Sequence, residues 1–546
     1  MSNRYSAPLS IDHRGQVPRP PVPRATAWAI SIACLGGAVY AVLIVVAMLD
    51  TNVNMLQALT VAPLLVLFTV PIALRIARKE RDRTLAAIVM AALIAKLLGA
   101  LVRYYVAYTV YSGAADATRY DNEGRRFAEF FRQWDFDIEY GKVVGTGFIE
   151  ILTGVVYAIF GSSKLGGFLV FAWLGFLGLV LFWRAFRIGI PGGDGRRYML
   201  LVLFLPSLLY WPSSIGKEAW VMLGLGISAV GVASVLRGRG GGALWLVIGL
   251  VVLGMVRPHV GLVVFAGLVF AVLVRKAPAK TYLAPLIRIV GLCFLLVVGV
   301  VLAGRTASFL GVESLTQESV ETELTATEAQ TAEGGSSFTP IRLRTPLHFP
   351  PAFVTVFFRP FPFESSTTQG LISAGEGLLL LGLCIVSGRR LRSIPAMIRT
   401  TPYLAFSIGY VLVFVYAFSS FSNFGILARQ RVQALPLLLV PLALPIFRPS
   451  APKAKGAPLT MRARPAVPRQ PVQAGSSPPA STSRSAGTSR SSSGFRPPGR
   501  RARRSTESTS PRPNDAAASD PDAFPVDAEI SRDPRSSDAS PRPPER

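Results

Sequence analysis

The sequence predicts an all-α integral membrane protein with about twelve transmembrane helices, both termini in the cytoplasm and a disordered C-terminal tail. Hydrophobic residues make up 51% of the 546 residues and charged residues only 16%, whereas an average soluble domain carries about 25% charged residues. The mean hydropathy is +0.43. The basic residues behind the net charge of +26 lie between long apolar runs and in the two end segments. This distribution indicates membrane topology and not a nucleic-acid-binding surface.

Metal and disulfide chemistry is disfavoured by the residue counts. Cys34, Cys293 and Cys384 lie in apolar runs, without the spacing of a metal site or a disulfide framework. Only three histidines occur, which disfavours a zinc hydrolase. No Walker loop, dinucleotide fingerprint or nucleophile elbow stands in a suitable context. A divalent cation is left open as a cofactor.

The first elements are predicted from apolar length and arginine distribution. Residues 1–25 are rich in Pro and Arg and should be cytoplasmic, and the run 26–49 is too long for a signal peptide. Spans follow at 56–76 and 85–111. The basic loop 75–83 between them belongs in the cytoplasm by the positive-inside rule.

The first outer segment, about 112–164, begins with charges of both signs and ends with the short apolar run 145–161. If this run crossed the membrane, the next span would deliver Arg184 and Arg187 to the outer face, against the positive-inside rule. We therefore expect a helix that lies at the outer interface or dips into the membrane and returns.

The remaining spans alternate, and their basic turns, notably 187–197 and 388–400, fall in the cytoplasm. These spans are expected at 165–186, 198–212, 217–236, 243–257, 259–275, 288–304, 369–387, 402–420 and 431–447.

The second outer segment, 305–368, has two halves of different composition. The first half is acidic and poor in apolar residues, which predicts a mobile loop; its acidic residues are Glu313, Glu318, Glu321, Glu323 and Glu328. The second half, 347–364, is aromatic and punctuated by proline, which suits an interfacial or re-entrant segment. After the membrane domain 26–447, the Pro/Ser/Arg-rich residues 448–546 should form a disordered, basic cytoplasmic tail.

Charged residues at the outer ends of spans are the candidate functional residues, because polar groups at membrane depth are costly. Asp116 and Tyr120 are four residues apart and would lie on one face of a helix. Asp116 could act as a general base, with Asp121 in reserve. An ordinary amphipathic helix whose charges face water is the alternative.

Two further positions could meet a phosphate. Lys217 and Glu218 follow a very short outer loop, and Lys217 would begin a helix with Ser214 as its cap; a lysine that snorkels to the interface is the alternative. Arg257 and His259 lie at an outer hairpin, where they are best explained by a polar cavity.

The last candidates are arginines at the outer mouth of the final span. Arg429 and Arg431 would lie on the outer face, although the positive-inside rule favours arginines in the cytoplasm. Their guanidinium forks match phosphate oxygens. Arg359 belongs to the same group. The alternative for Arg429 and Arg431 is that the pair bridges to Glu364 or to the first outer segment.

In this order the features resemble the bacterial multi-spanning glycosyltransferases of the GT-C type, and the polytopic proteins of exopolysaccharide and O-antigen polymerisation. The matching pieces cover roughly residues 85–447 and are Asp116 with Tyr120, Tyr-Ala-Ile-Phe-Gly (157–161), Trp-Arg-Ala-Phe-Arg (183–187), Pro-Ser-Leu-Leu-Tyr-Trp (206–211) with Lys217-Glu218, Arg257-Pro258, and Arg-Gln-Arg-Val-Gln-Ala-Leu-Pro-Leu (429–437). The chain departs from many GT-C enzymes because two spans precede the one that leads into its acidic loop, and because Ala117 follows Asp116.

The resemblance implies a GT-C-like fold in the bacterial cytoplasmic (inner) membrane, and transfer of sugars from a polyprenyl-phosphate-linked donor to a glycan acceptor on the outer face. Asp116 would be the base and the basic residues would hold the lipid phosphate. A lipid-linked glycan transporter or flippase stays open, as does a non-catalytic scaffold that binds envelope-assembly proteins through the tail. Membrane lipids are expected partners in each case, and nucleic acid in none.

Overall fold

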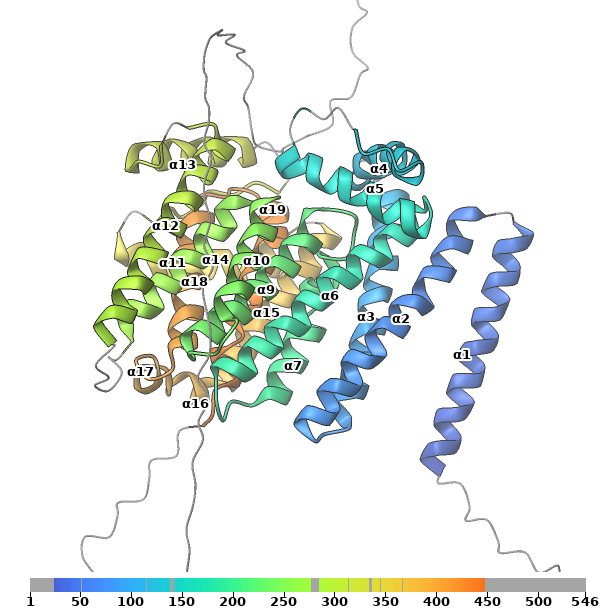
Figure 1. Ribbon diagram of the computed structural model, residues 1–546, viewed down its shortest axis with the longest axis horizontal. Helices are drawn as coiled ribbons and strands as arrows, with labels where there is room; N and C mark the ends of the chain where they lie inside the picture. Colours follow the sequence, from blue (N-terminus) through green and yellow to red (C-terminus); the bar gives the residue numbers. More distant parts are fainter. Residues whose placement is uncertain are drawn as a thin grey trace, which may run out of the picture. The chain divides into compact units, whose positions relative to one another are not determined.

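The computed structural model is built from helices alone in the part of the chain that it describes (Figure 1). It describes residues 24–446 except 51, 114, 138–140, 142, 276–283, 313, 333–335, 344 and 366, and not the side chains of 24–34 and 284–295. The predicted tail, the first 23 residues, Glu313 and the side chains of Cys34 and Cys293 lie outside these described residues.

The helices fall into two halves along the chain. The first half contains α1 (Arg24–Leu49), α2 (Val53–Glu80), α3 (Thr84–Tyr105) with a π-helical turn η1 (Val106–Val110), α4 (Asp116–Arg132), the turn η2 (Val143–Gly147) leading into α5 (Phe148–Phe160), α6 (Lys164–Gly189), α7 (Gly195–Phe204), α8 (Pro206–Tyr210) and α9 (Lys217–Leu236). The second half contains α10 (Gly242–Gly254), α11 (Pro258–Val274), α12 (Ala284–Leu310), α13 (Gln317–Ala332), η3 (Pro346–His348), α14 (Phe349–Phe358), η4 (Pro362–Glu364), α15 (Thr368–Val386), α16 (Gly388–Leu391), α17 (Ile394–Met397), α18 (Pro402–Phe418), α19 (Phe424–Gln430), η5 (Arg431–Gln433), α20 (Leu435–Leu438) and η6 (Pro441–Ala443).

The described helices include six that are long and apolar enough to cross a membrane, or up to eight if two bent pairs each count as one span. The bent pairs are α16–α17 with α18 and α19–η5 with α20–η6. Several shorter apolar helices accompany them, among them α10 and α11. The chain is therefore a helical protein with apolar, membrane-capable helices, and the expected total of about twelve spans stays a prediction.

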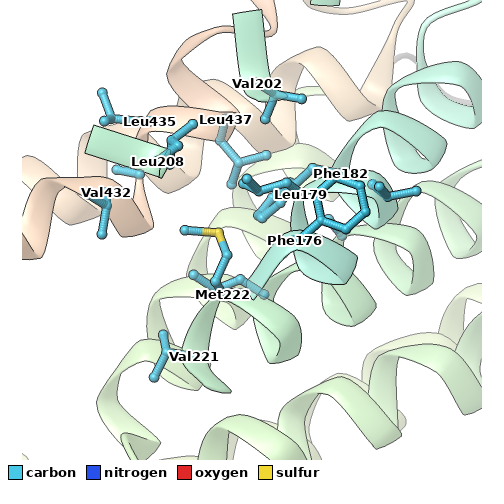
Figure 2. Close-up of a cluster of buried hydrophobic side chains, with 14 of the residues drawn as sticks. Phe176, Leu179, Phe182, Val202, Leu208, Val221, Met222, Val432, Leu435 and Leu437 are labelled. Atoms are coloured by element: carbon cyan, nitrogen blue, oxygen red, sulfur yellow. The ribbon is translucent and has the colours of Figure 1, made fainter. Parts of the chain in front are cut away.

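Helices α6 and α9 form the centre of the packing, and glycines let their backbones meet. A Cβ atom on Gly178 of α6 would lie 2.3 Å from the carbonyl oxygen of Met222 of α9. A Cβ on Gly226 would in turn lie 2.4 Å from the carbonyl oxygen of Gly178. Figure 2 shows the apolar cluster beside this contact, where Phe176, Leu179 and Phe182 of α6 approach side chains from α7, α8, α9 and α20. Small residues at such contacts are typical of membrane helices.

The segment 198–212, expected as one span, is not a continuous helix, because the chain breaks between α7 and α8. Leu205 takes an extended conformation before Pro206, as proline disfavours helical geometry in the residue that precedes it. The buried Lys96 of α3 donates a hydrogen bond to the carbonyl of Leu208, at 2.6 Å. Gly99 allows the close approach, since a Cβ there would lie 2.5 Å from the carbonyl oxygen of Leu209.

The acidic part of the second outer segment is also helical, and not the expected loop. Residues 317–332 form α13, which is rich in the helix formers Glu, Gln and Ala. Ser422 ties this helix to the end of α18, because its hydroxyl donates to the carbonyl of Glu328 at 2.7 Å and meets the Thr331 hydroxyl at 2.8 Å.

The final expected span at 431–447 is irregular where described: η5, α20 and η6 are single turns, and the chain bends by 64°. Pro436 and Pro441 each begin or interrupt one of these turns. Residues 145–161, expected at the interface or re-entrant, form the end of η2 and α5. They pack on α4, where a Cβ on Gly124 would lie 2.5 Å from Thr153 Cγ2.

The arginine-rich turns meet on one side of the molecule. Arg187 at the end of α6 pairs with Glu80 at the end of α2 at 2.6 Å, and Arg390 pairs with Asp194 before α7 at 3.0 Å. The polar helices α4 and α13 and the short helix α19 lie at the opposite ends of the long helices (Figure 1). The candidate functional residues are on this second side.

Candidate functional site

Asp116 stands at the first position of α4, and a short connection, residues 111–115, separates it from the π-helical turn η1 that follows α3. A carboxylate is favourable there because it faces the unpaired backbone N–H groups and the positive end of the helix dipole. Its side chain is 50% exposed. Arg429 of α19 donates to it through Nη2, at 2.8 Å from Oδ2, although the two residues are 313 positions apart in the chain.

A chain of ion pairs continues from Arg429 into the protein. Arg429 Nε donates to Glu218 Oε1 at 2.7 Å, and Arg257 Nη2 donates to the same oxygen at 3.1 Å. Glu218 is 4% exposed, so the two guanidinium groups provide the compensation that a buried carboxylate needs. Arg257 is further held by Gln430 Oε1 at 2.8 Å. Four predicted residues, Asp116, Glu218, Arg257 and Arg429, therefore form one network.

Tyr120 lies beneath Asp116 on the same face of α4 and is buried. Its burial, with the nearby Asp116 and Glu218 carboxylates, raises the pKa of Tyr120. The phenol therefore stays protonated at physiological pH. Lys217 is also buried and lies within the field of Asp116, Glu218, Arg257 and Arg429. The predicted Ser214 cap is wrong, because Gly216 precedes α9 in an extended conformation and no side chain caps the helix.

A cavity of about 310 Å³ opens beside Asp116 and Arg429 and also contains Arg103 of α3 in its wall. We call it the charged cavity. Arg103 donates to Tyr210 Oη at 3.0 Å and lies 4.8 Å from the centre of the Trp211 ring, in cation–π geometry. The charged cavity thus has one half-exposed carboxylate, two guanidinium groups and an aromatic wall.

Arg103 was not among the predicted site residues. The signal was present, since an arginine inside the apolar run 85–111 is expensive unless it faces a polar space. It was hidden because the run reads as one uniform span, whereas α3 passes into the π-helical turn η1 just after Arg103.

Asp121, the reserve base, is placed differently from Asp116. It is fully buried and accepts hydrogen bonds from Arg125 Nε at 3.1 Å and from Tyr157 Oη at 2.6 Å, while Lys164 Nζ lies 3.5 Å away. These partners join α4, α5 and α6. The arrangement favours a structural role for Asp121, as an anchor of α4.

His259 and Arg431 also lie away from the charged cavity. His259 is packed against Phe309 with ring centres 5.6 Å apart. Its Nδ1 has no hydrogen-bond partner among the described residues. Arg431 is fully buried, and its guanidinium faces the backbone carbonyls of Arg359 at 3.1 Å and Ser373 at 3.4 Å, with Glu376 at 3.7 Å. Arg431 therefore ties the bent final helices to α14 and α15.

Arg359 pairs with Glu364 through three hydrogen bonds of 2.6–3.1 Å. The alternative given for Arg429 and Arg431 holds for Arg429, which bridges to Asp116 of the first outer segment, whereas the carboxylate nearest to Arg431 is that of Glu376. Within the described part of the chain, no group of three His, Cys, Asp or Glu side chains could hold a metal ion.

The arrangement can bind an anion and move a proton. Two arginines face the charged cavity, and arginine forks match the oxygens of phosphate. Asp116 is the carboxylate that a ligand there could reach. No protein-family model, curated protein or solved structure matches this chain.

Proposed function

We propose that the protein is a membrane glycosyltransferase or polysaccharide polymerase of the GT-C type, which transfers sugars from a polyprenyl-phosphate-linked donor to a glycan acceptor. The observation that carries the proposal is the charged cavity, whose wall contains the half-exposed Asp116 together with Arg103 and Arg429. A lipid-linked sugar phosphate combines an anionic group with a polar ring, and this cavity offers cations, one base and aromatic surfaces to such a ligand.

The chemistry follows from the charges. Arg103 and Arg429 would neutralise the donor phosphate, and this attraction strengthens as the bond from the anomeric carbon to the phosphate oxygen breaks. The bonding electrons leave with the phosphate, so no acid is needed on that side. An acceptor hydroxyl oxygen forms the new bond to the anomeric carbon, and Asp116 takes the hydroxyl proton. One carboxylate is enough, unlike in a hydrolase with a paired acid and base.

The pairing of Arg429 with Asp116 suits this order of events. Without a donor, the Arg429 guanidinium is occupied by the Asp116 carboxylate. A donor phosphate competes for the same guanidinium. Glu218 keeps hold of Arg429 through Nε, so the planar guanidinium stays in place while Nη2 exchanges the Asp116 oxygen for a phosphate oxygen.

The distribution of charge supports a cytoplasmic (inner) membrane location in a bacterium, with both termini in the cytoplasm. The arginine-rich turns at Arg187, Asp194 and Arg390 meet on one side, and the charged cavity opens on the side of α4 and α19. The positive-inside rule then puts the cavity on the outer face, where it would meet a donor in the outer leaflet.

A transporter is less well supported than a transferase. A transport path should present charges near the middle of several helices, and Lys96 of α3 and Glu376 of α15 are described residues at such positions. Glu376 is buried and accepts a hydrogen bond from Ser207 N at 3.1 Å. Lys96 is fully buried, and its ammonium group is engaged by the Leu208 carbonyl. Lys96 therefore stabilises the break between α7 and α8 and does not line a transport path. The scaffold alternative depends on the tail, so it predicts that the protein fails when the tail is removed.

The test is the replacement Asp116→Asn, with Asp137→Asn on the same outer segment as control. Asn keeps the size and the hydrogen bond to Arg429 but cannot accept the proton, so the rate of transfer should fall by at least about 10²-fold. The assay compares lipid-linked glycans and surface polysaccharide in a deletion strain that carries each variant, and then transfer by the purified variants. Asp137 is exposed, so its variant should behave as wild type.

Two outcomes would count against the proposal. Wild-type turnover by Asp116→Asn would dismiss Asp116 as the base, and the buried Asp121 could not replace it without rearrangement of α4. A deletion strain with unchanged lipid-linked glycans and unchanged surface polysaccharide would contradict the enzyme function itself.

A further inference from the structure

A second cavity adjoins the charged cavity and has a different chemistry. It measures about 180 Å³ and lies between the start of α15, the turn η4 and residues 336–337. Gln369 and Gly425 line both cavities, so the two spaces are neighbours. We call the second space the hydroxyl cavity, because its wall contains the hydroxyl groups of Ser336, Ser337, Ser365, Thr367 and Ser373.

The hydroxyl cavity carries almost no net charge. Among the described residues that line it, Glu364 alone is charged. Arg359 donates to both oxygens of this carboxylate. Burial alone would raise the pKa of Glu364, but the hydrogen bonds from Arg359 and from the Phe361 backbone N–H lower it. The carboxylate therefore stays ionised and compensated, and the cavity does not favour a charged ligand.

Two polar groups in the wall are available for a ligand. Among the described residues, neither the Ser337 hydroxyl nor Gln369 Nε2 has a hydrogen-bond partner in the protein. Gln369 is held in place from the other cavity, because Tyr111 Oη donates to its Oε1 at 2.5 Å. Its amide nitrogen can therefore donate to a ligand at the junction of the two cavities.

The wall has an aromatic part that is rigidly supported. The rings of Phe338 and Phe424 stack with centres 4.1 Å apart, and the Arg359 guanidinium lies about equally far from both, at 4.9 and 5.0 Å. Backbone hydrogen bonds from Phe338 N to Ser422 O at 2.7 Å and from Phe424 N to Ser336 O at 3.1 Å join the two stretches of chain. Phe424 also lines the hydroxyl cavity.

We infer that the hydroxyl cavity binds the acceptor of the transfer reaction, and that this acceptor is an uncharged sugar. The wall of the hydroxyl cavity offers several hydroxyl groups, one amide, one aromatic ring and a compensated carboxylate. This set of groups suits an uncharged sugar ring with its hydroxyl groups. A peptide fits less well, since peptide sites use free strand edges, apolar pockets or apolar grooves, whereas the apolar side chains here are Pro360 and Phe424. The name acceptor rests on the proposed transferase function; the sugar site itself does not.

The position of Gln369 defines which end of the hydroxyl cavity faces the charged cavity. A sugar held by Gln369 Nε2 lies at the boundary with the charged cavity, into which Asp116 and Arg429 project. The hydroxyl that becomes the nucleophile would cross this boundary, and the rest of the acceptor would extend along the hydroxyl cavity. The donor phosphate thus occupies the charged cavity, and the acceptor sugar occupies the neighbouring hydroxyl cavity, which carries almost no net charge.

The experiment measures binding and does not require turnover. The full chain in lipid nanodiscs is titrated with neutral tetrasaccharides of glucose, mannose, galactose and arabinose. Tetragalacturonate serves as the anionic sugar probe, and a Ser/Thr-rich peptide serves as the peptide probe. Ser337→Trp fills the cavity from an exposed position, and Thr322→Trp on the exposed face of α13 is the matched control. At least one neutral tetrasaccharide should bind, with affinity reduced at least about tenfold in Ser337→Trp and unchanged in Thr322→Trp.

The inference is overturned if no neutral tetrasaccharide binds the wild-type chain, if Ser337→Trp binds as well as wild type, or if only tetragalacturonate or the peptide binds. Failure of the transferase proposal looks different. In that case neutral sugar still binds and Ser337→Trp still blocks it, while Asp116→Asn leaves the cell's glycans unchanged.

Discussion

Arg429 and Arg431 are separated by one residue, yet they serve different purposes. Two positions correspond to about 200° on a helix, so the two side chains point to opposite sides. Arg429 is 28% exposed and reaches Asp116 in the charged cavity. Arg431 is fully buried and reaches the carbonyls of neighbouring segments. The first can meet a ligand, and the second holds the fold.

This difference predicts opposite effects of one substitution at the two positions. Arg429→Lys replaces the fork with a point charge that cannot bridge Glu218 and Asp116 together, so transfer should fall while thermal stability changes little. Arg431→Lys leaves buried carbonyl groups without donors, so the free energy of unfolding should fall by about 1–3 kcal/mol. Thermal unfolding and transfer are measured for both purified variants. Equal loss of stability in the two variants would contradict the division of roles.

Residue type and topology were enough to single out Asp116, Glu218, Arg257 and Arg429, because charges at the outer ends of spans need a polar space, and the structure brings these four side chains into one network. They could not separate Asp116 from Asp121. The burial of Asp121 comes from Tyr157 and Lys164, which belong to α5 and α6. Contacts between helices far apart in the chain decide which carboxylate faces the cavity, and apolar periodicity does not encode them.

Helices α6 and α9 depend on glycines for their contact, so stability at the scale of elements should be sensitive to one added methyl group. Gly178→Ala puts a Cβ 2.3 Å from the Met222 carbonyl oxygen, which forces the helices apart and should cost about 1–3 kcal/mol. Gly382→Ala in α15 is the control, since no atom lies within 4 Å of its Cβ position. Alanine also favours a helix more than glycine does. Thermal unfolding that is unchanged in Gly178→Ala would disprove this close contact.

Apolar length predicted the continuous helices α2, α3, α6, α9 and α15, since a long apolar run has few other structures in a membrane. It failed where a proline interrupts such a run, at Pro206 and in the final segment. Pro63 and Pro71 occur inside α2 without breaking it, so a proline alone does not reveal a break. At Pro206 the break is stabilised by Lys96, which supplies a donor to the Leu208 carbonyl from another helix.

At the scale of the molecule, the described residues that line the charged cavity and the hydroxyl cavity lie between Arg103 and Arg429. The sequence predicts that residues 448–546 lie in the cytoplasm, whereas the cavities are proposed to open on the outer face. A transferase and a scaffold therefore make different predictions for the same truncation.

Removal of residues 455–546 should leave transfer within about twofold of the full chain, because the sequence predicts a disordered cytoplasmic tail and the proposed chemistry takes place on the outer face. The truncated protein and the full chain are compared at equal membrane abundance, by surface polysaccharide in the deletion strain and by transfer after purification. A version of the truncated chain with Asp116→Asn serves as the inactive reference. If the truncated chain reaches the membrane normally but restores no polysaccharide, the tail carries the essential function, and the scaffold replaces the transferase as the explanation of this protein. If it restores polysaccharide and the Asp116→Asn version does not, the essential function belongs to the membrane domain and to its half-exposed carboxylate.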